Sequence, residues 1–76
     1  MEAEIKAVLA KVFDVELGAI DASFGPGAVE NWDSAGHMRL IMALEESFDV
    51  MFDDDDVENL VSIKAIADSI AGLKAN

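Results

Sequence analysis

The spacing of apolar residues is the feature that most constrains the fold of this 76-residue chain. Three separate segments have the spacing of an amphipathic helix. No stretch of strand length alternates between apolar and polar residues, as a half-buried strand does. In the first segment the apolar residues at i, i+3, i+4, i+7 and i+8 are Ile5, Val8, Leu9, Val12 and Phe13. This stripe predicts an amphipathic helix over residues 2–14.

A second helix is expected over residues 34–48. Asp33 and Ser34 are both good helix-capping residues, and they follow a loop that contains Gly25-Pro26-Gly27. One arc of this helix should face the core, and it contains Leu40, Ile41, Leu44 and Phe48. Met38 and Met42 fall outside that arc. They either form a patch that faces a partner or pack under the loop.

The last third of the chain predicts a short helix over residues 55–60 and a final helix that Ser62 caps. The apolar stripe of the final helix consists of Ile63, Ile66, Ala67, Ile70 and Leu73. We therefore expect an all-α fold, a small four-helix bundle of three main helices and a short third one. It should form one domain of residues 1–76 with a long loop between its first two helices.

That loop, residues 15–33, is long enough to suggest a functional role. Its irregularly spaced apolar residues should pin it over the helices, and they are Leu17, Ile20, Phe24 and Val29. A short turn fits residues 19–22. Trp32, at the end of the loop, either anchors it in the core or contacts an attached group or a partner.

Four consecutive aspartates at residues 53–56 invite comparison with a calcium loop. An EF-hand starting at Asp53 would need Gly at its sixth position and Glu at its twelfth, where this chain has Glu58 and Lys64. We therefore exclude an EF-hand and expect no specific metal site. Weak, nonspecific binding of divalent cations would relieve the repulsion among the carboxylates.

The chain has 16 acidic and 5 basic residues, which gives a net charge of −11. Such a surface repels nucleic acid and anionic membranes and suits partners that have basic docking patches. The sequence shows no secretory pattern and no apolar stretch of membrane-spanning length. These observations predict a cytoplasmic monomer that binds neither nucleic acid nor membranes.

No catalytic constellation is visible. Ser34 could act as a nucleophile only with a base close by, and the sole histidine, His37, is three residues further on. Asp33 is poorly placed to orient His37, and no oxyanion hole is evident. We therefore expect no enzyme. His37 falls at the exposed end of the core arc and should be half-buried.

Together these features resemble a known family. Asp33-Ser34, the helix that continues as Leu-Ile-Met-Ala-Leu-Glu-Glu over 40–46, the acidic segment and the last helix resemble the acyl carrier proteins over about residues 3–73. The resemblance implies that Ser34 carries a 4'-phosphopantetheine arm, attached from coenzyme A by a phosphopantetheinyl transferase. Because the chain has no cysteine, the thiol of an acyl thioester would have to come from such a group.

The resemblance also implies roles for the residues around Ser34. Asp33 would cap the helix and pair with a basic residue of the transferase. His37 would line the mouth of the cavity that shelters acyl chains and tune what enters it, and Met38 would lie beside the arm. Partner enzymes that transfer or activate acyl groups would dock on positions that match Met42, Glu45, Glu46 and Asp54.

Three residues depart from the family pattern. Ala35 stands where Leu is usual, Gly36 where an acidic residue is frequent, and Arg39 where Glu is frequent. Arg39 has no acidic neighbour three or four residues away, so its charge can face outward and discriminate among docking partners. Gly36 lowers helix stability by about 0.5–1 kcal/mol relative to Ala, which the chain either tolerates or uses for flexibility.

The departures predict a specialised carrier that the general enzymes of fatty-acid synthesis serve poorly. Its pathway would be fatty-acid synthesis or specialised lipid or secondary-metabolite synthesis. Two alternatives stay open: a carrier of aminoacyl or polyketide units, and an acidic helical interaction module that bears no arm.

Overall fold

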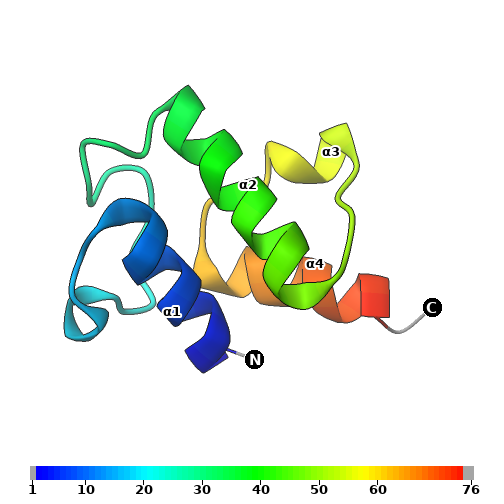
Figure 1. The fold of residues 1–76 in the computed structure, drawn as a ribbon, viewed down its shortest axis with the longest axis horizontal. Coiled ribbons are helices and arrows are strands. Elements are labelled where there is room, and N and C mark those ends of the chain that lie inside the picture. The colour runs from blue at the N-terminus through cyan, green and yellow to red at the C-terminus, as the bar shows by residue number, and fades with distance from the viewer. Residues whose placement is uncertain (1, 75–76) are drawn as a thin grey trace.

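A computed structural model describes residues 2–74 of the chain. It contains four α-helices and one 3-10 turn, which are α1 (Glu2–Phe13), η1 (Leu17–Ala19), α2 (Ser34–Phe48), α3 (Asp54–Val57) and α4 (Ile63–Lys74) (Figure 1). The described residues contain no strand, and three long helices with one short third helix confirm the expected all-α class. The short helix is the least accurate prediction, because it spans Asp54–Val57 rather than residues 55–60.

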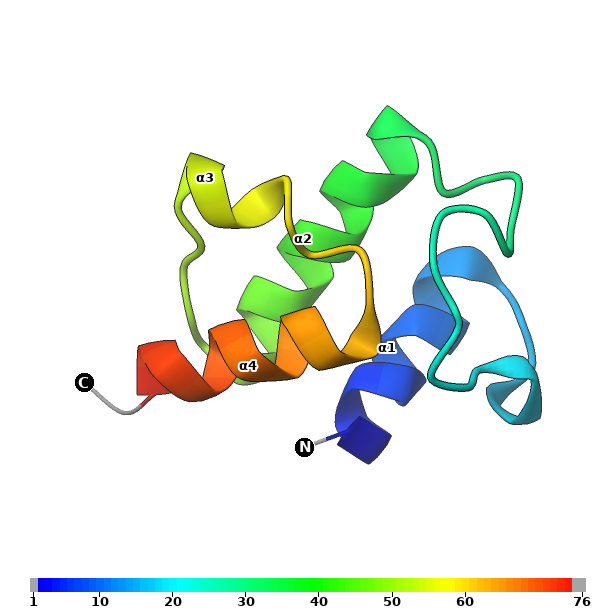
Figure 2. The same cartoon turned by 180° about the vertical axis from the view of Figure 1, so that it is seen from behind.

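α1 packs against both α2 and α4, and the long loop and α3 lie on opposite sides of α2 (Figures 1 and 2). The core draws on every long helix and on all three connections between the helices. Its buried side chains are Ile5, Leu9, Phe13, Ile20, Phe24, Trp32, Leu40, Ile41, Leu44, Phe48, Phe52, Leu60, Ile63, Ile66 and Ile70. The predicted core arc of α2 is therefore confirmed. No helix within residues 2–74 combines the length and the apolar character that crossing a membrane requires.

Two aspartates end the first two long helices. Asp14 and Asp49 both have a φ of 54°, the left-handed conformation in which a helix commonly stops. α1 therefore ends at Phe13, one residue before the predicted end. At the start of α4 the Ser62 hydroxyl accepts a hydrogen bond from the Ala65 amide at 3.1 Å, as a capping residue should.

The long loop is held by aromatic side chains at its end. Trp32 is buried and stacks on Phe13, with ring centroids 4.7 Å apart, so its role as a core anchor is confirmed. Phe24 packs on the same indole at 5.9 Å. Leu17 was expected to pin the loop, but it is 55% exposed because it lies in η1, which turns its side chain outward. The turn expected at residues 19–22 overlaps η1 at its start, and at its end it overlaps a second turn in which the Phe24 amide donates to the Asp21 carbonyl oxygen at 3.0 Å.

Candidate functional site

Ser34 is the first residue of α2, and its side chain is exposed. The Asp33 carboxylate caps the helix, because it accepts a hydrogen bond from the Gly36 amide at 2.8 Å. The His37 amide donates to the Asp33 carbonyl oxygen at 2.7 Å. Among the described residues, no acceptor pairs with the amides of Ser34 and Ala35. An anion attached to Ser34 would therefore meet two unpaired N–H donors and the positive end of the helix dipole.

Gly36 is buried in the first turn of α2. A Cβ at this position would collide with the backbone carbonyl oxygen of Asn31, and the Asn31 side chain in turn donates to the Phe13 carbonyl at 3.3 Å. Glycine therefore allows the loop backbone to cross directly against the start of the helix. The sequence suggested that Gly36 is either merely tolerated or useful for a flexible first turn. The structure gives another reason, which is the close approach of the loop backbone to the helix.

A pocket of about 480 Å³ lies beside Ser34. It is formed by the end of the long loop, the first turns of α2 and the segment after α3, and its lining residues are Trp32, Asp33, Ser34, His37, Met38, Glu58 and Val61. The structure thus brings all four residues expected around the arm to one place. The sequence did not predict that Glu58 and Val61 line this pocket, where Val61 is 43% exposed. Helical spacing gives no information on where the segment after α3 crosses α2.

His37 is half-buried, as expected, and its ring links three segments. The Trp32 indole N–H donates to Nδ1 at 2.9 Å, and Nε2 lies 2.6 Å from the Val57 carbonyl oxygen. Because an indole nitrogen can only donate, Nδ1 is the acceptor, and Nε2 carries the proton that is donated to Val57. Both ring nitrogens are therefore occupied, and His37 is not available as a base for Ser34.

The docking residues expected on α2 and α3 are mostly on the surface. Met38 and Met42 are 53% and 65% exposed, so packing under the loop is wrong for both. Glu46 and Asp54 are also exposed. Glu45 is half-buried, and its carboxylate accepts a hydrogen bond from the Phe52 amide at 3.0 Å. This carboxylate therefore helps to hold the connection between α2 and α3.

Arg39 is exposed. The one salt bridge among the described residues joins Lys64 to Asp68 at 2.8 Å, so no carboxylate there pairs with Arg39. A hydrogen bond to Asp68 raises the pKa of Lys64, and hydrogen bonds from Ser23 lower the pKa of Asp21. Within residues 2–74 no group of three potential ligands is arranged to hold a metal ion, the four aspartates included.

Comparison with known proteins adds information that the geometry lacks. No family model matches the chain. The acyl carrier protein of Campylobacter jejuni subsp. doylei is 34% identical over 71 residues, which cover 93% of this chain and 92% of that protein. Two proteins of the same name, from Buchnera aphidicola subsp. Schizaphis graminum and subsp. Baizongia pistaciae, are 33% and 36% identical, and each alignment covers 92% of this chain. The matches cover 89% and 90% of those two relatives.

Proposed function

This chain belongs to the acyl carrier protein family, and from that premise we propose that Ser34 carries 4'-phosphopantetheine, on which acyl groups are held as thioesters. The chain is a carrier and not an enzyme, in agreement with the names of its relatives. The whole of residues 1–76 would serve as one carrier domain. The bound group would supply the thiol that the cysteine-free sequence lacks.

The observation that carries the proposal is the setting of Ser34. Its hydroxyl is exposed at the first position of a 15-residue helix, next to a pocket and beside unpaired amides. Asp33 keeps the helix start ordered, and its second carboxylate oxygen is available to a basic residue of a transferase. A phosphodiester on Ser34 fits this setting because helix N-termini favour anions and nothing covers the hydroxyl.

The residues around the pocket would determine how an attached acyl group packs against it. Met38 and Val61 supply apolar surface, and His37 fixes the pocket wall through its bonds to Trp32 and Val57. Since both imidazole nitrogens are engaged, His37 would act on an acyl chain by shape and position and not by proton transfer.

We expect partners to be a phosphopantetheinyl transferase and enzymes that transfer or activate acyl groups, acting on a cytoplasmic monomer. Basic patches on these enzymes would meet Glu46 and Asp54, with Met42 as an apolar contact. Glu45 would contribute only the part of its carboxylate that the Phe52 amide leaves free. Arg39 would repel the basic patches that a purely acidic helix attracts, which favours a specialised lipid or secondary-metabolite pathway over general fatty-acid synthesis.

The deciding experiment is intact-protein mass spectrometry after co-expression with a phosphopantetheinyl transferase. The expected result is a gain of one phosphopantetheine group on the wild-type chain and none on Ser34→Ala. Failure of every transferase tried would instead indicate an unmodified interaction module. The mass of the cargo on the native protein then separates a fatty-acyl carrier from an aminoacyl or polyketide carrier.

A further inference from the structure

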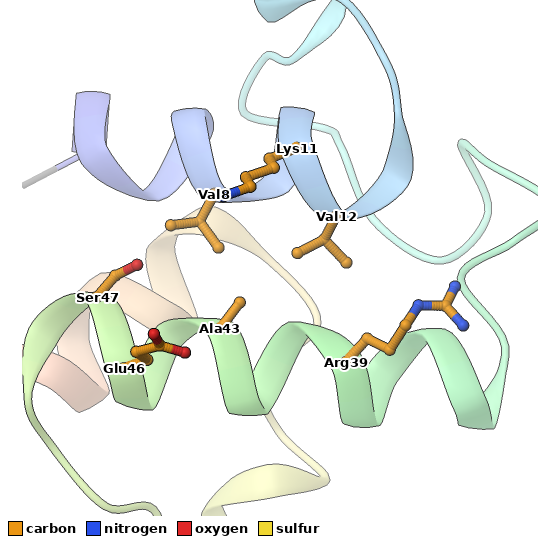
Figure 3. Close-up of a pocket in the computed structure, with 7 residues that line it drawn as sticks. All are labelled: Val8, Lys11, Val12, Arg39, Ala43, Glu46 and Ser47. Carbon is orange, nitrogen blue, oxygen red and sulfur yellow. The ribbon is translucent and has the colours of Figure 1, made fainter.

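A second hollow lies between α1 and α2, away from the Ser34 pocket, and we call it the α1–α2 groove. It has a volume of about 550 Å³, and its lining includes Val8, Lys11, Val12, Arg39, Ala43 and Glu46. In Figure 3 Val8 and Val12 point from α1 towards α2, and Ala43 points back towards them. The centre of the groove is therefore apolar, and its charged residues lie around that centre.

The α1–α2 groove contains more positive charge than the rest of this acidic chain would suggest. Two of the five basic side chains of the sequence, Lys11 and Arg39, line it. Both are exposed, and neither forms an ion pair within residues 2–74. Figure 3 shows the Arg39 guanidinium extending beyond one end of the groove, while Glu46 lies towards the other end. The lining thus carries two positive charges and one negative charge, and on a chain with a net charge of −11 this local positive excess, concentrated at the Lys11 and Arg39 side of the groove, can attract negative charge beside apolar surface.

The groove faces a different direction from Ser34. At about 100° per residue along α2, Met38 is about 40° from Ser34, whereas Arg39 and Ala43 are about 140° and 180° away. A partner on the groove would therefore leave the Ser34 pocket uncovered. Leu9, Leu40 and Leu44, on the same two helices, are fully buried, so the core below is filled and gives no depth for a long alkyl chain.

We propose that the α1–α2 groove docks a helical segment of a partner protein that presents acidic side chains beside apolar ones. Apolar contacts would be made to Val8, Val12 and Ala43, and carboxylates would pair with Lys11 and Arg39. A second copy of this chain is disfavoured as the occupant, because two molecules of charge −11 repel each other. This docking does not depend on modification of Ser34, so it can hold or fail independently of the proposed carrier function.

The probe for the test is a synthetic helical peptide of about four turns, with a leucine stripe, two flanking glutamates and otherwise uncharged residues. Titrated into the ¹⁵N-labelled chain, it should shift the amide resonances of Val8, Val12 and Ala43. The double variant Lys11→Glu/Arg39→Glu should weaken binding by about tenfold or more, because both attractions become repulsions. The matched control is Lys64→Glu/Lys74→Glu on α4, which has the same net charge and should bind within about twofold of the wild type.

Several results would overturn the proposal. One is an equal loss in both double variants, which would show that only the overall charge matters. Another is a set of shifts centred on Met38 and Met42, which would place the peptide on the other face. Shifts in the groove that grow with protein concentration without peptide would identify a second copy as the occupant. Equal shifts with decanoate would identify an anionic amphiphile.

Discussion

At the scale of single residues, the His37 side chain joins separate segments of the chain around the Ser34 pocket. Its ring accepts a hydrogen bond from Trp32 at the end of the long loop and donates one to Val57 at the end of α3. It also lies roughly parallel to the indole, with ring centroids 6.2 Å apart. One side chain thus fixes the positions of the loop, α2 and α3 around the pocket.

We predict that His37→Ala destabilises the fold by about 1–3 kcal/mol, because it leaves the Trp32 N–H and the Val57 carbonyl without partners. His37→Gln should lose less, since its amide can accept from Trp32 and donate to Val57. Urea unfolding followed by the fluorescence of the single tryptophan measures both. A His37→Ala variant as stable as the wild type would show that the two hydrogen bonds contribute nothing.

Asp21 allows a second residue-scale prediction. The Ser23 hydroxyl and, secondly, the Ser23 amide donate to its carboxylate and lower the pKa of Asp21 below its ordinary value of 3.8. A depressed folded-state pKa means that the stabilisation is present above the unfolded-state pKa and is lost as pH falls through the folded-state pKa. Ser23→Ala should therefore raise the pKa of Asp21, which a carboxyl ¹³C NMR titration measures. An unchanged titration curve would contradict the assignment.

At the scale of elements, the start of α2 depends on how closely the loop approaches it. The loop carbonyl of Asn31 occupies the space where a side chain at Gly36 would lie. Gly72, inside α4, is the opposite case, because a Cβ there would meet nothing within 4 Å. The two glycines have the same intrinsic helix propensity, so the difference between them isolates the effect of the loop.

We predict that Gly36→Ala destabilises the protein by about 1–3 kcal/mol. The backbone must shift to avoid the collision, and the free-energy cost of that shift outweighs the better helix propensity of alanine. Gly72→Ala should instead stabilise α4 by about 0.5–1 kcal/mol. Thermal unfolding by circular dichroism compares them. If both substitutions raise the melting temperature, the loop can move aside at little cost.

The elements also show how much could be predicted from the sequence. Helical spacing predicted the buried faces of all three long helices, because burial of a stripe needs only local geometry. It also predicted the Asp33 cap, which lies three residues from its donor. The bonds from Phe52 to Glu45 and from His37 to Val57, and the contact of Asn31 with Gly36, could not be predicted. Each depends on where a loop crosses a helix, and no local pattern specifies that.

At the scale of the whole molecule, charge is the dominant long-range force. A net charge of −11 is held within a Cα radius of gyration of 11.3 Å. The Debye length is about 30 Å at 0.01 M salt and about 8 Å at 0.15 M, so at low salt every carboxylate acts on nearly every other one. The one ion pair within residues 2–74, Lys64–Asp68, is exposed and offsets little of this repulsion.

We therefore predict that the protein becomes more stable as salt is raised from about 0.01 to 0.15 M, by roughly 1 kcal/mol or 4–8 °C in melting temperature. The double variant Asp53→Asn/Asp55→Asn, which removes two exposed charges from the N-cap and first turn of α3, should show a smaller rise. Magnesium chloride should act without a saturable step, in keeping with nonspecific binding, since no described group of ligands is arranged for a metal ion. A melting temperature that falls with salt would mean that attractive pairs outweigh the repulsion, and a saturable magnesium response would reveal a defined site.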